Sequence, residues 1–376
     1  MSKKAEKITV IKVNKENSNN TNDVKKEYHF KNLVFEGGGV KGIAYVGALE
    51  VLDQEGILKD IERVAGTSAG AMVAVLVGLG YTPKELGDVL WDIKFKNFLD
   101  CDWGVVRNTK RLLDDYGWYK GDFFRDLMAD YIEKKTGKRD LTFGELKKMR
   151  KEGKPYRDIH LIGADLTTGL SVVFNSELTP KVTIADAARI SMSIPLFFAA
   201  IKGVNGDDHI YVDGGLLDNY AIKAFDRESF ASNEDSIRRP DYYKKDNDKL
   251  KKITEKSQSK KTINEYVYNK ETLGFRLDAA EEIAMYLDPD AQAPTKEIKS
   301  FFTYTKALVT TLIDFQNNVH LHSDDWQRTV YINSLGISAT DFDISDKKKT
   351  DLVESGRKYA KDYLDWYNND EEKANK

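Results

Sequence analysis

Short apolar runs that end in glycine recur in the first part of the chain. One such run covers residues 32–35 and a second covers residues 63–65. The first is followed by apolar positions spaced about 3.6 residues apart over 44–52, which predicts a helix, and the second by a segment at 71–79 that is apolar nearly all round, which predicts a buried helix. A strand, a glycine turn and a helix, repeated twice, are typical of a parallel α/β sheet with right-handed crossovers.

The apolar pattern farther along the chain predicts more elements of both kinds. Short runs bounded by turn residues indicate strands, and helical periodicity indicates helices. We expect strands at 158–164, 171–174, 209–212 and 329–332, a helix at 184–192, mainly helical segments at 81–150 and 263–328, and an amphipathic terminal helix over 352–366.

Changes in composition divide the chain into four parts. Residues 1–29 are polar and rich in Lys and Asn, and predict a flexible tail. Residues 30–225 are expected to form the α/β domain. Of the first 36 residues in 226–262, 19 are charged, so this segment is interpreted as a charged insertion or linker. Residues 263–376 predict a helical C-terminal region with a strand near 329–333 that returns to the sheet.

Charge and cysteine content exclude several functional classes. The chain carries 58 Lys and Arg against 61 Asp and Glu, a net charge of −3, which argues against a nucleic-acid partner. The single cysteine, Cys101, excludes an intramolecular disulfide framework. The longest apolar run, 69–81, is too short for a membrane span, and no secretory signal is recognisable. We expect a cytoplasmic or peripheral membrane protein, with a specialised secretion route left open.

The segment Gly66-Thr67-Ser68-Ala69-Gly70 has the form G-x-S-x-G between a predicted strand and a predicted helix. A nucleophile elbow holds its serine in a strained turn, where side chains at Gly66 and Gly70 would clash. The N-terminus of the following helix favours negative charge nearby. Ser68 is therefore the candidate nucleophile, and a structural glycine turn is the alternative.

A second glycine motif, Gly37-Gly38-Gly39-Val40-Lys41-Gly42, also satisfies G-x-G-x-x-G. A dinucleotide fold would need an acidic residue at the end of the next strand, whereas Asp60 and Glu62 stand before it. The other use of such a loop is an oxyanion hole built from backbone N–H groups. Because neighbouring parallel strands bring both turns to one sheet edge, the oxyanion hole is the favoured interpretation.

A serine nucleophile needs a side chain that accepts its proton. None of the five histidines has a persuasive position, and His160 and His209 are expected at the sheet end opposite the glycine turns. In contrast, Asp213-Gly214-Gly215 places a carboxylate at the end of an apolar strand, followed by two glycines that allow close approach. Asp213 is therefore the candidate general base.

This ordered set of three motifs resembles the patatin-like phospholipase family over about residues 31–225, and Ala188 to Pro195 resembles the segment preceding that family's aspartate. The resemblance implies an α/β fold with a parallel-rich sheet flanked by helices, related to the α/β-hydrolase architecture. It implies a Ser68–Asp213 dyad without histidine and an oxyanion hole in the 37–42 loop, with Gly38 and Gly39 as donors. Lys41 and Gly42 would support that loop.

The resemblance also implies a phospholipase A-type lipid acyl hydrolase that acts on membrane phospholipid or another acyl lipid and needs no cofactor or metal. An activating protein partner, an acyltransferase reaction and a neutral lipid substrate stay open. Two alternatives from other classes are an inactive lipid-binding or partner-binding module and a nucleotide-dependent oxidoreductase. For the fatty-acyl trough, we consider Ile194, 196–198 and the aromatic residues of 91–124 as candidates.

Overall fold

A computed structural model describes residues 27–93, 112, 114–204, 206–256, 263–278, 298–299, 303–304, 307–308, 311–312 and 324–369. Residues 1–26 of the tail expected over 1–29, and most of residues 279–323 of the helical region expected over 263–328, lie outside these residues.

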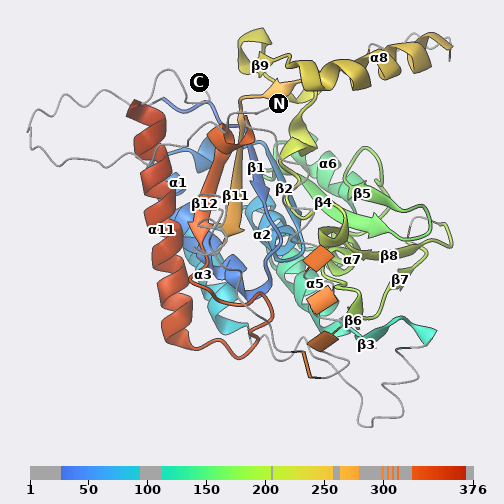
Figure 1. Ribbon diagram of the computed structural model, residues 1–376, viewed down its shortest axis with the longest axis vertical. Coiled ribbons are helices and arrows are strands. Elements are labelled where there is room, and N and C mark those ends of the chain that lie inside the picture. Colours follow the sequence, from blue (N-terminus) through green and yellow to red (C-terminus); the bar gives the residue numbers. More distant parts are fainter. Residues whose placement is uncertain are drawn as a thin grey trace, which may run out of the picture.

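A mixed, mostly parallel sheet forms the centre of the molecule (Figure 1). Its strand order is β12-β11-β1-β2-β4-β8-β7, and β5 pairs with β4 off this path. The strands are β1 (Asn32–Phe35), β2 (Arg63–Thr67), β4 (Asp158–Asp165), β5 (Leu170–Phe174), β7 (Ile201–Lys202), β8 (Ile210–Asp213), β11 (Thr272–Asp278) and β12 (Thr329–Asn333). The pairs from β12 to β4 are parallel, whereas β5 and β8 are antiparallel to β4. The expected α/β class is confirmed.

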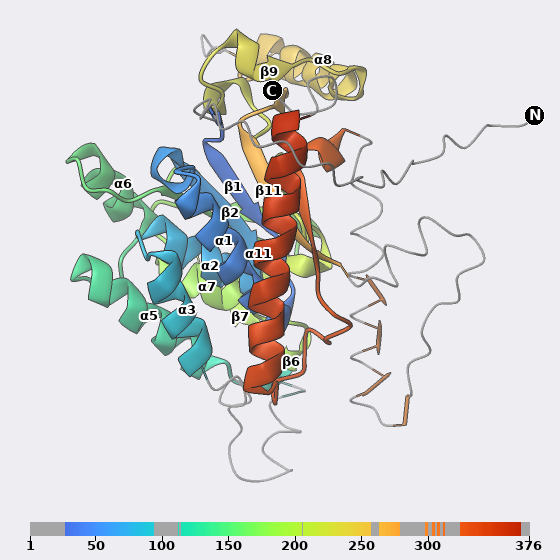
Figure 2. The same ribbon diagram turned by 90° about the vertical axis from the view of Figure 1, so that its left-hand side faces the viewer.

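Helices flank this sheet, and two short strand pairs lie outside it (Figures 1 and 2). The helices are α1 (Ala44–Gln54), α2 (Ala69–Gly78), α3 (Pro83–Asp92), α5 (Asp122–Thr136), α6 (Phe143–Lys151), α7 (Ile184–Ser191), α8 (Asp241–Lys256) and α11 (Asp346–Asn369). The short pairs join β3 (Gly117–Tyr119) to β6 (Leu196–Phe198), and β9 (Ile237–Arg238) to β10 (Tyr268–Asn269). In both views α8 and β6 lie at opposite ends of the molecule.

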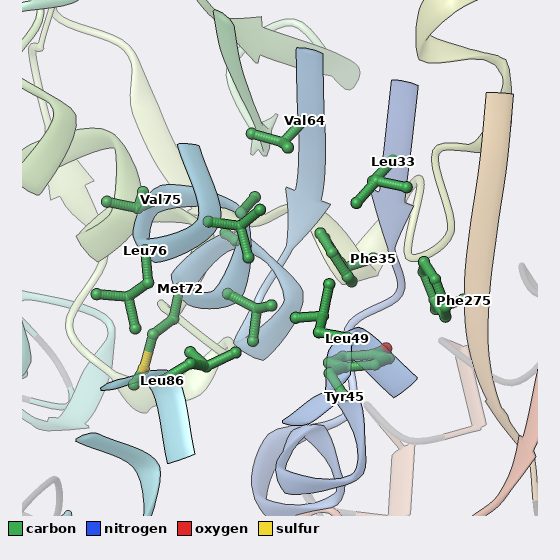
Figure 3. Packing of buried hydrophobic residues seen from close by; sticks show 14 of the residues in the cluster. Leu33, Phe35, Tyr45, Leu49, Val64, Met72, Val75, Leu76, Leu86 and Phe275 are labelled. Atoms are coloured by element: carbon green, nitrogen blue, oxygen red, sulfur yellow. The ribbon is translucent and has the colours of Figure 1, made fainter. Parts of the chain in front are cut away.

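The hydrophobic core fills the space between the sheet and these helices (Figure 3). Helix α2 is buried along nearly its whole length, as its continuous apolar sequence predicts. Phe35 of β1 stacks on Phe275 of β11 with ring centroids 5.3 Å apart, and Tyr45 of α1 meets Phe35 edge-on. These contacts fix β1, and therefore the glycine loop that follows it, against the core.

The structure differs from expectation after residue 225. Residues 272–278, expected to be helical, form the fully buried strand β11 between β1 and β12. Its sequence includes Arg276 and Asp278, and such charges usually indicate an exposed helix face. Here the two side chains form an ion pair with each other, N to O 3.1 Å, which makes burial tolerable.

The segment over 226–262 was expected to be a charged insertion or linker, but its first residue belongs to the protein interior. Asp226 is fully buried and bonds both guanidinium Nη atoms of the equally buried Arg328, at 2.6 and 2.7 Å. Residues 241–256 of this segment form helix α8, and residues 257–262 lie outside the described part. The structure therefore ties the beginning of this segment to the main body of the molecule.

Candidate active site

Ser68 stands in a sharp turn between β2 and α2. Its backbone is in the left-handed region, with φ of +54°, and its side chain is almost fully buried. A Cβ at Gly66 would come within 2.2 Å of the Gly70 carbonyl oxygen, and one at Gly70 within 2.3 Å of the Phe35 carbonyl oxygen. Both glycines are therefore required by close backbone contacts, as the elbow pattern predicts.

A second serine holds this turn in place. The backbone N–H of Ser68 donates to Oγ of Ser191 at 2.9 Å, and the Ser191 hydroxyl donates to the Ile162 carbonyl at 2.6 Å. Ser191 thus links the end of α7 to the elbow and to β4. The sequence analysis did not single out Ser191, although it lies inside the 188–195 segment on which the resemblance partly rests.

Asp213 reaches the elbow because of the strand register. Thr67 pairs with Ile162 on β4, and the next β4 residue, Gly163, pairs with Asp213 on the antiparallel β8. A Cβ at Gly214 would lie 2.5 Å from the Ile162 carbonyl oxygen, so glycine permits this approach. The structure therefore brings together two side chains separated by 145 positions in sequence (213 − 68).

Burial controls the protonation of Asp213, which has only 1% of its surface exposed. Desolvation raises the pKa of Asp213 to about 7, although hydrogen bonds from the Gly215 N–H and the Ser68 side chain lower it. The Gly215 N–H lies 2.7 Å from Oδ1 of Asp213. The carboxyl thus has a pKa suited to proton transfer near neutral pH, while the Ser68 hydroxyl itself donates to Sδ of Met192 at 3.7 Å.

The glycine loop lies directly beside Ser68. A Cβ at Gly37 would be 3.0 Å from the Ser68 Cβ, and one at Gly39, whose φ is +55°, would be 1.9 Å from the Ala339 carbonyl oxygen. Among the hydrogen bonds of the described residues, none uses the N–H of Gly38 or of Gly39 as donor. These two groups are therefore available to a ligand at the elbow.

The remaining loop positions have supporting contacts. Nζ of Lys41 donates to the Leu277 carbonyl at 3.0 Å, so this side chain binds β11. A Cβ at Gly42 would lie 3.4 Å from Cβ of Ala69, at the start of α2.

The sequence analysis did not single out Glu36, which stands directly before the loop. Only the structure shows that its side chain is buried. Desolvation raises the pKa of Glu36 to about 7, while Arg276 lowers it.

An apolar cavity adjoins the elbow, with a volume of about 20 Å³, enough for one water molecule. It is lined by Gly39, Gly42, Ile43, Ala69, Met72, Val73, Leu90, Met192 and Phe342. Among the trough candidates that the structure describes, none lines it, and the candidates within 94–111 lie outside the described residues. The wall comes instead from α2, the end of α7 and the loop after β12.

His209 lies elsewhere than expected. Because β8 runs antiparallel to β4, its first residues lie at the C-terminal end of β4, and Nδ1 of His209 is 2.8 Å from Oδ2 of Asp165. This ion pair raises the pKa of His209 and is distinct from the Ser68–Asp213 contact. In the described part of the chain, no group of three or more His, Cys, Asp or Glu side chains could hold a metal ion.

This α/β fold with a serine elbow, a buried aspartate and a glycine loop is a hydrolase-like arrangement, and comparison with known proteins identifies its class. The sequence model described as patatin-like phospholipase matches residues 33–226. The chain belongs to the patatin-like phospholipase family.

The chain is also similar to individual proteins. The Bacillus subtilis protein YqhO is 30% identical over 342 residues, which cover 88% of this chain and 97% of that protein. The probable lipid hydrolase 463L of invertebrate iridescent virus 6 is 28% identical over 202 residues, 52% of this chain and 63% of the viral protein. The crystal structure of VipD from Legionella pneumophila shares the fold, with a TM-score of 0.52 and 16% identity over 90% of this chain and 67% of VipD.

One further observation concerns membranes. Within the residues described, no helix combines the length and apolar character needed to cross a bilayer.

Proposed function

We propose that this protein is a phospholipase A-type lipid acyl hydrolase that works through an acyl-enzyme on Ser68. The observation that carries the proposal is the strand register that brings the buried Asp213 beside the elbow of Ser68. Family membership supports the substrate class, a fatty-acyl ester of phospholipid or another lipid. The name of the viral relative, a probable lipid hydrolase, points to the same class.

In the first half of the reaction, Ser68 Oγ attacks the ester carbonyl while Asp213 takes its proton. An aspartate in water has a pKa of about 3.9 and is a weak base. Burial raises the pKa of Asp213 to about 7, and this match to neutral pH strengthens it as a base. The N–H groups of Gly38 and Gly39 would hold the oxyanion, and Gly37 keeps the loop against Ser68.

The bond to the alcohol then breaks, and protonated Asp213 gives its proton to the leaving oxygen, which completes the acyl-enzyme. In the second half, water attacks the acyl-enzyme as Asp213 accepts its proton; the bond to Ser68 Oγ breaks, Asp213 returns the proton to Oγ, and the fatty acid is released. An alcohol in place of water would give acyl transfer, which makes an acyltransferase the related alternative within this class. The scheme uses no metal or cofactor.

Labelling with a fluorophosphonate probe tests the nucleophile. We expect the wild type and the control Ser171→Ala, a change on an exposed part of β5, to be labelled and Ser68→Ala to remain unlabelled. Equal labelling of Ser68→Ala would refute the assignment. No labelling of the wild type would favour the inactive lipid-binding or partner-binding module.

Turnover of a panel of phospholipids and neutral lipids tests the base and identifies the substrate. Asp213→Asn should keep the fold and lose most turnover, at least about 100-fold, because the amide cannot accept the serine proton. Asp122→Asn at the exposed start of α5 is the matched control and should remain active. Near wild-type turnover of Asp213→Asn would show that another group is the base.

A further inference from the structure

Glu36 is a buried carboxylate directly before the glycine loop, with 1% of its surface exposed. Oε2 accepts the backbone N–H of Leu277 at 2.6 Å, and Oε1 accepts Nδ2 of Asn219 at 3.4 Å. Nε of Arg276 lies 3.8 Å from Oε1. One carboxylate therefore joins three elements: the end of β1, the strand β11 and the segment after β8.

The same partners also contact the loop itself. Asn219 uses both its side chain and its backbone, because Nδ2 donates to the Gly37 carbonyl at 3.2 Å and its carbonyl accepts the Gly37 N–H at 3.0 Å. On the other side, a Cβ at Gly38 would be 2.6 Å from Cδ1 of Leu277. The loop is thus enclosed by groups that Glu36 holds.

Much of this support comes from outside the region that defines the family. The family match ends at residue 226, whereas Leu277 and Ala339 lie in the C-terminal region. The Ala339 carbonyl accepts the Val40 N–H at 3.0 Å, directly after the glycine triplet. The C-terminal region therefore contributes to the geometry of the loop, and Glu36, beside Val40 and Lys41, is one of the polar links between them.

We propose that Glu36 is a positioning residue that orients the N–H groups of Gly38 and Gly39 toward the reacting carbonyl, by anchoring the loop to β11 and Asn219. This inference rests on the proposed function, because it assigns these N–H groups to an oxyanion. Glu36 does not touch the substrate.

A carboxylate suits this role for two physical reasons. Its two oxygens accept hydrogen bonds in different directions, so one side chain can hold β11 and Asn219 at once. A glycine triplet has no side chains of its own to limit its backbone conformations, so its geometry depends on external contacts. Oxyanion donors act only when they point at the developing charge. A small shift of the loop therefore weakens the binding of the transition state more than the binding of the substrate.

Three variants of the full chain test the proposal: Glu36→Ala, Glu36→Gln and Asn219→Ala. Turnover of a fatty-acyl ester is measured per active site, counted by complete fluorophosphonate labelling, so that loss of folded protein does not lower the value. We expect kcat to fall about 100-fold in Glu36→Ala and about 10-fold in Asn219→Ala, with KM within about threefold. Glu36→Gln should retain more activity than Glu36→Ala, since its amide oxygen can still accept the Leu277 N–H.

Inhibitor binding separates positioning from a structural role. A fatty-acyl trifluoromethyl ketone forms a tetrahedral adduct with an oxyanion, whereas the free fatty acid does not. Affinity for the ketone should fall in parallel with kcat in these variants, while affinity for the fatty acid stays unchanged. Asp226→Asn, which removes a buried charge in a different cluster, is the control and should lower stability without changing kcat per active site.

Two outcomes would overturn the inference. One is that Glu36→Ala and Asn219→Ala keep kcat and ketone affinity within twofold of the wild type. The other is that Glu36→Ala fails to fold while Asn219→Ala and Glu36→Gln behave as the wild type, which would make Glu36 purely structural. Failure of the proposed function looks different, because then the wild type itself neither labels at Ser68 nor hydrolyses the ester.

Discussion

At the scale of single residues, the environment of Asp213 determines both its chemistry and its effect on stability. An aspartate that is 1% exposed has lost its hydration, and the pKa of its carboxyl rises to about 7. The Gly215 N–H, which donates to the carboxylate, and the neighbouring Ser68 side chain oppose this rise. The same burial that makes Asp213 a stronger base therefore makes its charged form unfavourable in the folded protein.

The pH dependence of activity follows from this pKa. The base form of Asp213 is needed, so kcat/KM for a neutral ester should rise with pH through about 7 and fall about tenfold for each pH unit below it. Initial rates between pH 5 and 9 measure this. Glu36, whose pKa is also raised to about 7, is the competing group, so the rising limb should persist in Glu36→Gln. A flat profile down to pH 5 would contradict the assignment.

The ionisation of Asp213 should also affect the stability of the folded protein, but with the opposite dependence on pH. The folded-state pKa of Asp213 is about 7 and the unfolded value about 3.9, so the folded state binds more protons between them and its stability falls as pH rises through this range. Asp213→Asn should therefore raise the free energy of unfolding by roughly 2–4 kcal/mol at pH 8 and by less at pH 5. Urea unfolding at the two pH values checks this, and an equal change at both would refute it.

At the scale of elements, helix α11 packs closely along α1 through two glycines (Figure 2). A Cβ at Gly47 of α1 would be 1.9 Å from the Val353 carbonyl oxygen, and one at Gly356 of α11 would be 1.8 Å from the Ala44 carbonyl oxygen. The two backbones thus meet without intervening side chains. Because the glycine loop runs directly into α1, this contact also supports the position of the loop.

Gly356→Val tests the close approach. The added side chain would force α11 away from α1, and we expect the free energy of unfolding to fall by about 2–4 kcal/mol. Lys361→Val is the matched control, since it places the same residue type on the exposed face of the same helix and should change stability by less than about 1 kcal/mol. Equal effects of the two substitutions in urea unfolding would show that the helix contact adds little.

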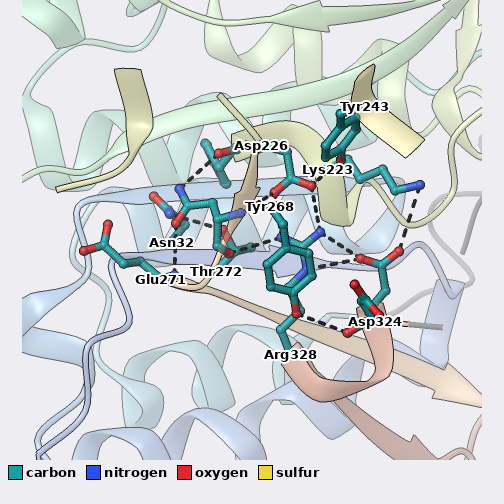
Figure 4. A network of polar contacts seen from close by, with 12 residues as sticks. Asn32, Lys223, Asp226, Tyr243, Tyr268, Glu271, Thr272, Asp324 and Arg328 are labelled. Carbon is teal, nitrogen blue, oxygen red and sulfur yellow. Dashed lines mark hydrogen bonds and ion pairs between the residues drawn. The ribbon is translucent and has the colours of Figure 1, made fainter. Parts of the chain in front are cut away.

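At the scale of the whole molecule, a buried polar cluster joins the C-terminal region to the family domain (Figure 4). Arg328, next to β12, bonds Asp226 and, through Nη2, Oδ1 of Asp325 at 2.8 Å. Asp226 also accepts the Tyr243 hydroxyl of α8 at 2.5 Å. A residue at the end of the family match thus contacts the segments on both sides of β11, so these parts of the chain share one folded core.

Removal of the arginine should destabilise this junction strongly. Arg328→Met leaves Asp226 buried without its cation, and we expect a loss of about 3–5 kcal/mol of unfolding free energy at pH 7. The double variant Arg328→Met with Asp226→Asn should be less destabilised than Arg328→Met alone, because the uncompensated charge at Asp226 is removed. Chemical unfolding of the wild type, the single variants Arg328→Met and Asp226→Asn, and the double variant measures the coupling, and additive effects would contradict it.

The sequence by itself determined the features that depend on neighbouring residues. The strand–glycine–helix units at 32–54 and 63–78 follow from apolar periodicity and from turns that only glycine tolerates, and the structure confirms both. The motif around Ser68 was recognisable because close backbone contacts exclude any side chain at Gly66 and Gly70, so glycine must stand at both positions. The roles of Ser68 and Asp213 remain predictions, although the structure brings the two side chains together.

Only the tertiary structure decided the features that depend on distant pairing. From the sequence, the residues of β11 were expected to be helical. Only the structure shows that Arg276 pairs with Asp278 inside the protein, where both charges can be buried. The approach of Asp213 to Ser68 depends on a strand register across β4. The role inferred for Glu36 rests on partners at residues 219 and 277. A local pattern records the propensity of a segment, whereas the burial and pairing of a charge are properties of the assembled fold.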